Sequence, residues 1–135
     1  MGVIICGKTL TSTSCQITHE PSGANIITTA PKDNGGDGSH FSPTDLCASA
    51  MGSCAATIMA MAAQKQNIPL NEITFKVEKI MSPSPRKIAE LKCTYIIHSN
   101  CSDNDFAKLI KAGKECPIRL TLAGAVQVTE EFLRA

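Results

Sequence analysis

The chain contains no tryptophan, and aromatic residues make up only 4% of its 135 residues. A hydrophobic core must therefore be built from aliphatic side chains, alanine and methionine, which favours close packing of helices. An excess of either charge is also missing, because 13 Lys and Arg oppose 12 Asp and Glu, for a formal net charge of +1. This balance, without a basic cluster, argues against nucleic acid as the main partner. The length fits one compact domain, and we predict a single domain over residues 1–135.

The patterns of a disulfide scaffold and of a zinc site are missing as well. The seven cysteines are an odd number, no Cys-x-x-Cys occurs, and neither the cysteines nor the three histidines show zinc-ligand spacing. The first ten residues, MGVIICGKTL, lack the charged segment that begins a signal peptide. We therefore expect a cytoplasmic protein with free thiols, no metal and no cofactor.

Residues 46–63 carry no charge and approach the length of a membrane span. They are rich in Ala, Ser, Cys and Gly, no Trp or Tyr flanks them, and Lys is not concentrated on one side. We interpret the segment as a helix buried on all sides in a soluble protein, and we expect no membrane partner.

Alternation of apolar residues and the placing of turn residues predict the secondary structure. The first thirty residues predict three short strands, at 3–5, 14–19 and 25–29. A helix is expected from Pro43 to about residue 67, because Ser42 can cap it and Asp45 completes a capping box. Strands follow at 72–81 and 87–99, then a helix capped by Ser102, then a last strand at 119–129. The order βββ-α-ββ-α-β predicts an α+β fold with a long buried central helix.

Two cysteines stand out as candidates for chemistry. Cys54 lies in the middle of the predicted central helix among small residues, and a packed core thiol is the alternative interpretation. Cys116 stands at a helix end before Pro117, where we expect it to be partly exposed and mobile. Cys47 lies seven residues before Cys54, about 10 Å along a helix, beyond the about 7 Å that a disulfide tolerates. Of the others, we expect three in the core, Cys6, Cys15 and Cys93, and Cys101 at the surface.

Three ordered motifs resemble the OsmC/Ohr family (osmotically inducible protein C-like and organic hydroperoxide resistance proteins). A glycine-rich loop, Asn34-Gly35-Gly36-Asp37-Gly38, precedes the proline-capped helix start and the alanine-rich run to Cys54. A turn, Ser84-Pro85-Arg86-Lys87-Ile88, precedes the second long strand. The Cys-Pro step lies in Lys114-Glu115-Cys116-Pro117-Ile118. The resemblance covers nearly the whole chain in the right order.

The resemblance implies an OsmC-like fold that forms an intertwined homodimer with two sites at its interface. It implies an antioxidant, peroxiredoxin-like activity in the stress response, the reduction of organic hydroperoxides. Cys54 matches the peroxidatic cysteine, Cys116 the resolving cysteine, and Asp33 the acid of the site. The sulfenic acid formed on Cys54 would close to a Cys54–Cys116 disulfide. The resemblance further implies reduction by a dithiol, such as a lipoylated protein.

The sequence departs from the family in its cation. The resemblance implies an N-terminal arginine beside the reactive cysteine, yet this chain has no arginine before Arg86. A thiol in the middle of a helix needs a nearby cation to lower its pKa, and Lys8, Lys32 and Arg119 are the candidates. The departure keeps two alternatives open. One is a non-catalytic OsmC-fold protein that binds a small apolar molecule at the dimer interface, and the other is a structural dimer with inert thiols.

Overall fold

Two three-stranded sheets organise the chain in this computed structural model, which describes residues 2–135. Contacts divide the chain into two units, Met1–Leu46 and Cys47–Ala135, each with one of the sheets. The first unit holds β1 (Ile5–Thr11), β2 (Ser14–His19) and β3 (Ala24–Thr29), in the order β1-β2-β3, all antiparallel. The predicted strands at 14–19 and 25–29 are confirmed, whereas the first strand lies later than residues 3–5 predicted. The strand pairs with β2 over Ile5–Thr11, and the register shifts between Thr9 and Thr11.

The second unit contains a sheet in the order β4-β5-β6. β4 (Glu72–Pro83) and β5 (Arg86–His98) form a long antiparallel pair, and β6 (Gln127–Arg134) lies parallel to β5. The alternation in β5 is confirmed, because one face of the strand is buried, formed by Leu91, Cys93, Tyr95 and Ile97. A parallel pair needs a crossover connection, and two helices supply it here.

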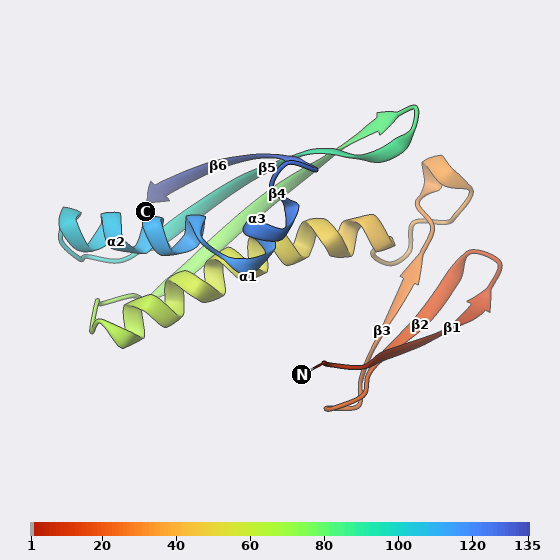
Figure 1. Ribbon diagram of the computed structural model, residues 1–135, viewed down its shortest axis with the longest axis horizontal. Helices are drawn as coiled ribbons and strands as arrows, with labels where there is room; N and C mark the ends of the chain where they lie inside the picture. The colour runs from red at the N-terminus through yellow and green to blue at the C-terminus, as the bar shows by residue number, and fades with distance from the viewer. Residues whose placement is uncertain (1) are drawn as a thin grey trace. The chain divides into compact units, whose positions relative to one another are not determined.

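The central helix, α1 (Pro43–Lys65), begins as its capping box predicts. The Ser42 hydroxyl accepts a hydrogen bond from the Asp45 N–H at 3.1 Å, and the Asp45 carboxylate accepts one from the Ser42 N–H at 2.9 Å. A short 3-10 turn, η1 (Lys32–Asn34), lies in the loop before it. Figure 1 shows α1 running along the β4-β5-β6 sheet, on the same side as the two later helices.

The predicted last strand at 119–129 is wrong. α2 (Asp103–Lys114), capped by Ser102 as expected, is followed by a second short helix, α3 (Pro117–Leu122), and only then by β6. Cys116 is the N-cap of α3 and Pro117 its first residue, a position that suits the fixed φ of proline. The α+β class is confirmed, with one helix more than the predicted order.

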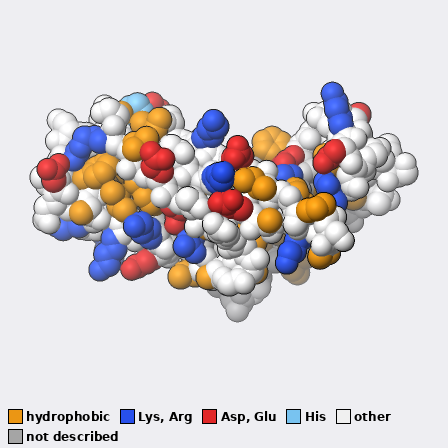
Figure 2. Space-filling model, turned by 90° about the horizontal axis from the view of Figure 1, so that it is seen from above, with side chains coloured by type: hydrophobic (Ala, Val, Ile, Leu, Met, Phe, Trp, Pro, Cys, Tyr) orange, Lys and Arg blue, Asp and Glu red, His pale blue; other side chains and the backbone are white. Residues whose placement is uncertain are grey.

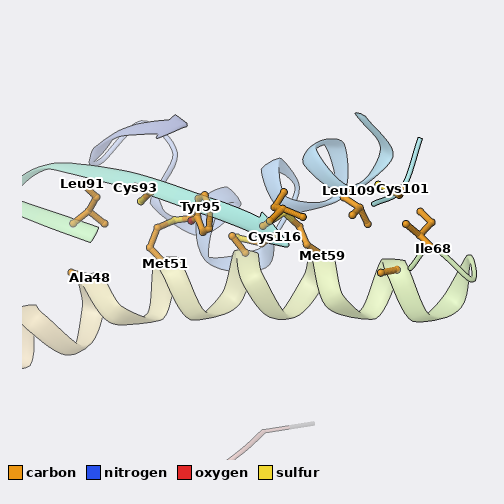
Figure 3. Close-up of a cluster of buried hydrophobic side chains, with 13 residues drawn as sticks. Ala48, Met51, Met59, Ile68, Leu91, Cys93, Tyr95, Cys101, Leu109 and Cys116 are labelled. Atoms are coloured by element: carbon orange, nitrogen blue, oxygen red, sulfur yellow. The ribbon is translucent and has the colours of Figure 1, made fainter. Parts of the chain in front are cut away.

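The core lies in the second unit between α1 and the sheet. Figure 3 shows Met51, Met59, Tyr95 and Cys116 between α1 and the strand and helices beside it. Aliphatic, alanine, methionine and cysteine side chains dominate this core, as the lack of aromatics predicts.

One face of α1 is buried and the opposite face is exposed, so the helix is not buried on all sides. Met51, Ala55 and Met59 are fully buried, as in the core helix of a globular fold. Its length and apolar composition would also suit a membrane span, a test that buried core helices pass as well. An exposed stripe follows the opposite side at helical spacing, formed by Ser53, Thr57, Ala60, Met61 and Gln64. On the face drawn in Figure 2, basic and acidic side chains are interspersed with hydrophobic ones.

Candidate active site

The two candidate cysteines meet within the second unit. Cys54 lies near the middle of α1 and is half-buried, and Cys116 caps α3. Cys54 packs against the buried cluster that contains Cys116, and its thiol is near enough to be one of the causes that raise the pKa of Cys116. Residues 62 positions apart in the sequence are therefore neighbours in the folded unit.

Close packing of α1 on the β4-β5-β6 sheet brings Cys54 to the layer of side chains between the helix and the sheet. A Cβ atom on Gly52 would lie 2.5 Å from the ring of Phe75 and 2.9 Å from a methyl carbon of Val77. Only a glycine lets the helix backbone approach β4 this closely. The small residues around Cys54 that the sequence shows thus serve helix–sheet contact next to the thiol.

Cys116 is fully buried, with 0% of its surface exposed, so the expectation of a partly exposed thiol is wrong. Its Sγ accepts a hydrogen bond from the Arg119 backbone N–H at 3.3 Å. Burial raises the pKa of the Cys116 thiol above its usual 9.0, the Arg119 bond opposes this, and Cys54 and Glu130 raise it further. The reduced protein therefore holds Cys116 as a neutral thiol at physiological pH.

An ion pair closes the site on the side of β6. The Arg119 Nε donates to Glu130 Oε1 at 2.9 Å, and the Glu130 side chain is only 5% exposed. Glu130 stands directly opposite Cys93 in the parallel pairing of β5 and β6. The second oxygen of this carboxylate, Oε2, is buried and has no hydrogen-bond partner within residues 2–135.

A buried tyrosine completes the cluster. Tyr95 is fully buried, its ring stacks on Phe132 with 4.9 Å between centroids, and its hydroxyl has no partner at hydrogen-bonding geometry in the described chain. Burial raises its pKa, and the negative charges that Cys93, Glu130 and Cys116 can carry raise it further. Burial likewise raises the pKa of Cys93, while the Tyr95 hydroxyl and Arg119 act against it.

The sequence alone did not identify Glu130, Tyr95 and Cys93 as neighbours of the candidate thiols. The signal for Glu130 was present, because a charged residue stands between Val128 and Phe132 on the face that points to the core. The strand predicted at 119–129 ended one residue too early to show it.

Other residues that the sequence analysis named belong to the first unit or to other positions of the second. Asp33 is exposed in η1, in the first unit, as are the candidate cations Lys8 and Lys32, so their roles beside Cys54 stay predictions. Cys47 is half-buried on α1. Two expectations for the other cysteines are wrong, because Cys6 is exposed and Cys101 is buried. Within residues 2–135, no three His, Cys, Asp or Glu side chains are grouped so that they could hold a metal ion.

Comparison with known proteins identifies the fold. Residues 36–131 match the family model described as OsmC-like protein. A solved structure described as an osmotic stress induced and detoxification response protein, from Psychrobacter arcticus, is 26% identical with a TM-score of 0.89, covering 98% of this chain and 97% of that one. An OsmC-like protein from Mycoplasma pneumoniae is 19% identical with a TM-score of 0.85, covering 100% and 98%.

A third structure carries a functional description. It is an organic hydroperoxide resistance protein, OsmC, from Legionella pneumophila, 20% identical with a TM-score of 0.72, covering 98% of this chain and 97% of that one. At this identity the likeness shows the fold alone. A search of curated proteins finds no match to the chain.

Proposed function

The chain belongs to the OsmC-like protein family, and we propose that it is a thiol-dependent peroxidase that reduces organic hydroperoxides. The observation that carries the proposal is the proximity of two thiols, Cys54 and Cys116, in the buried layer between α1 and the sheet. A peroxidase that works through a sulfenic acid and a disulfide needs two such thiols, one to react with the peroxide and one to form the disulfide.

The reaction proceeds in three balanced steps. The Cys54 sulfur attacks the terminal oxygen of the hydroperoxide, which breaks the O–O bond and leaves an alcohol and a sulfenic acid on Cys54. The Cys116 sulfur then attacks the Cys54 sulfur, so that a disulfide forms and the hydroxyl leaves as water with the thiol proton. A dithiol, such as a lipoylated protein, reduces the disulfide by thiol–disulfide exchange and is itself oxidised to a disulfide.

The surroundings of the pair favour an alkyl peroxide over hydrogen peroxide. The buried face of α1 next to Cys54 is apolar, and its fully buried residues are Met51, Ala55 and Met59. An apolar setting binds the hydrocarbon part of a substrate and gains little from a second hydroxyl. The description of the Legionella pneumophila relative as an organic hydroperoxide resistance protein agrees with this choice.

Separate replacement of the two cysteines tests the mechanism. We expect Cys54→Ser to abolish the consumption of cumene hydroperoxide with dihydrolipoamide as reductant. Cys116→Ser should consume about one peroxide per site and then stall as a sulfenic acid that dimedone traps. Cys47→Ser is the matched control, because it removes a half-buried thiol from the same helix, and it should retain full activity. Unchanged turnover in both Cys54→Ser and Cys116→Ser would remove the mechanism.

We also propose Asp33 as the acid of the site, on the strength of the family resemblance. Its substitution by Asn keeps the size of the side chain and removes its charge. We expect Asp33→Asn to slow the first step, the oxidation of Cys54, and to leave the later closing of the disulfide unchanged. Rapid-mixing measurements with one equivalent of peroxide separate the two steps, and an unchanged first step would exclude Asp33.

A second candidate function is the binding of a small apolar molecule without catalysis. One observation favours it: an open hollow of about 520 Å³ beside α1, lined by Ile58, Met61, Ala62, Gln64 and Lys65. A fluorescent apolar probe that binds near micromolar concentration, together with no peroxide consumption, would select this function over the peroxidase.

We propose that the protein acts as a cytoplasmic homodimer. No hydrophobic side chain among residues 2–46 belongs to the buried core, and apolar residues of the first sheet stay exposed, among them Ile5 at 63% and Ile26 at 49%. A three-stranded sheet needs an apolar cover to be stable, and a second copy of the chain is the cover that the family resemblance implies. All seven cysteines are free thiols, the state that a reducing compartment maintains.

Sedimentation tests the dimer. Ile26→Asp places a charge on the exposed apolar face of the first sheet, opposite Ile17, and should shift the protein to monomer. Leu133→Asp, at 40% exposure in the second sheet, is the control and should remain dimeric. A stable monomer of the unaltered protein at micromolar concentration would contradict the proposal.

A further inference from the structure

The helix that carries Cys116 has little to hold it in place. α3 is six residues long and has no buried residue, and Leu120 within it is 63% exposed. Ile118 and Leu122 pack partly against the core. α1, which carries Cys54, has six buried residues. Cys116 itself is buried in the core, so the position of its sulfur depends on that packing and on whatever fastens α3 beside it.

One polar contact fastens α3 to the sheet. Arg119, in the first turn of α3, donates from Nε to Glu130 of β6 at 2.9 Å. The same residue donates its backbone N–H to Cys116 Sγ at 3.3 Å. Arg119 thus touches the thiol with its main chain and the sheet with its side chain.

The burial of Glu130 makes this contact costly to break. The carboxylate is 5% exposed, and its second oxygen already has no partner among the described residues. Water cannot easily replace a lost guanidinium there, and removal of one partner of a buried ion pair leaves an uncompensated charge. A pair of this kind suits the holding of one geometry rather than the loose contact of an exposed pair.

We propose that the Arg119–Glu130 ion pair is a positioning pair that holds the Cys116 end of α3 against β6, so that the Cys116 sulfur stays opposite Cys54. The inference rests on the proposed function in one respect, the formation of a Cys54–Cys116 disulfide. Arg119 and Glu130 do not react themselves. Their role is to raise the effective concentration of one sulfur at the other, the term that most affects the rate of an intramolecular step.

The charge of Glu130 gives this pair a signature that a merely structural contact lacks. The groups around Cys116 are Cys54 from α1, Tyr95 from β5, Glu130 from β6 and Arg119 from α3, and from α2 the Lys114 ammonium lies over the ring of Phe132. Glu130 is the carboxylate in this set, and its charge contributes to the raised pKa of Cys116. Glu130→Gln removes that charge, while its amide oxygen can still accept from Arg119.

The experiment measures the effective concentration of the Cys54–Cys116 disulfide in the full-length protein. The protein is equilibrated with mixtures of reduced and oxidised dithiothreitol, alkylated, and analysed by peptide mass. We expect Arg119→Met to lower the effective concentration about tenfold, with Arg119→Lys between it and the unaltered protein. Arg134→Met is the matched control, because Arg134, at the other end of β6, forms an ion pair with Asp103 of α2 at 3.1 Å. It should change the effective concentration little.

Glu130→Gln supplies the second readout. We expect it to keep most of the effective concentration and to shift the pH profile of disulfide closing to lower pH. Equal effective concentrations in the unaltered protein and Arg119→Met, or an unshifted profile in Glu130→Gln, would overturn the proposal. If the unaltered protein forms no Cys54–Cys116 disulfide with oxidised dithiothreitol or peroxide, the proposed function fails with it. If that disulfide forms and Arg119→Met has no effect, only the positioning pair fails.

Discussion

The buried hydroxyl of Tyr95 makes a stability prediction whose sign is unusual. Tyr95 is fully buried, and its hydroxyl has no hydrogen-bond partner by geometry in the part of the chain that the structure describes. Replacement by Phe keeps the ring, its stacking on Phe132 at 4.9 Å and its tilted contact with Phe75 at 6.4 Å. Only the hydroxyl is lost, so the change isolates the cost of burying it.

The magnitude follows from that cost. A buried hydroxyl without a partner destabilises a protein by about 1–3 kcal/mol. The Cys93 thiol lies near this hydroxyl and offers weak hydrogen bonding, which places the expected gain near the lower end. We therefore expect Tyr95→Phe to raise the free energy of unfolding by about 1 kcal/mol.

Urea unfolding of the reduced protein at fixed concentration measures the change. The midpoint should rise while the slope stays the same, because the surface exposed on unfolding is unaltered. Thr94→Val is the control, since it removes a half-buried hydroxyl from the opposite face of β5, and it should change stability by less than about 0.5 kcal/mol. A loss of stability in Tyr95→Phe would refute the reasoning, because it would mean that the hydroxyl is bonded. A gain in stability with slower peroxide turnover would assign the hydroxyl to the site.

Three further predictions concern the same unit and the start of its helix. Burial raises the pKa of Cys93 and of Cys116 above the ordinary 9.0, so the folded protein holds these protons more tightly than the unfolded chain. The free energy of unfolding should therefore be at its full value below about pH 9 and fall as the pH rises above it. Alkaline unfolding followed by circular dichroism would show this. Gly52→Val should destabilise the protein by about 1–3 kcal/mol, since a Cβ would lie 2.5 Å from Phe75, and an unchanged thermal midpoint would contradict this packing. Ser42→Ala should cost about 1 kcal/mol through loss of the N-cap, with Ser39→Ala, in the loop before it, as the control for the loss of a hydroxyl.

Local signals predicted much of the fold. The capping box at Ser42 and Asp45 set the start of α1 correctly, and Ser102 did the same for α2. Alternation in β5 identified its buried face, because every second residue of a half-buried strand must turn to the core. These features depend on residues within a few positions of each other, and such features can be read from one sequence.

The errors depend on contacts between distant residues. Residues 119–122 alternate well enough to suggest the start of the predicted strand, whereas the helix that includes them depends on a cysteine as N-cap, which is an uncommon capping residue. Cys101 is buried where a surface thiol was expected, and Arg134 from the end of the chain donates to its carbonyl oxygen at 3.0 Å. The pairing of Arg119 with Glu130 likewise depends on the parallel docking of β6 beside β5. A local sequence pattern does not show which side chain from a distant part of the sequence will make the contact.

The two thiols differ in how firmly their helices are held, and this difference orders the proposed chemistry. Two free thiols have their sulfur atoms farther apart than the about 2.05 Å of a disulfide bond, so one sulfur must move when the bond forms. Cys54 lies on a 23-residue helix with six buried residues, whereas Cys116 precedes a helix of six residues with none. Cys116 is itself buried, but a shift of the short helix after it disturbs fewer buried residues than a shift of α1 would. The firmly held thiol is then suited to meet the substrate, and the thiol at the lightly packed end is suited to approach it. The ion pair at Arg119 keeps that approach short, because it ties the Cys116 end of α3 to β6.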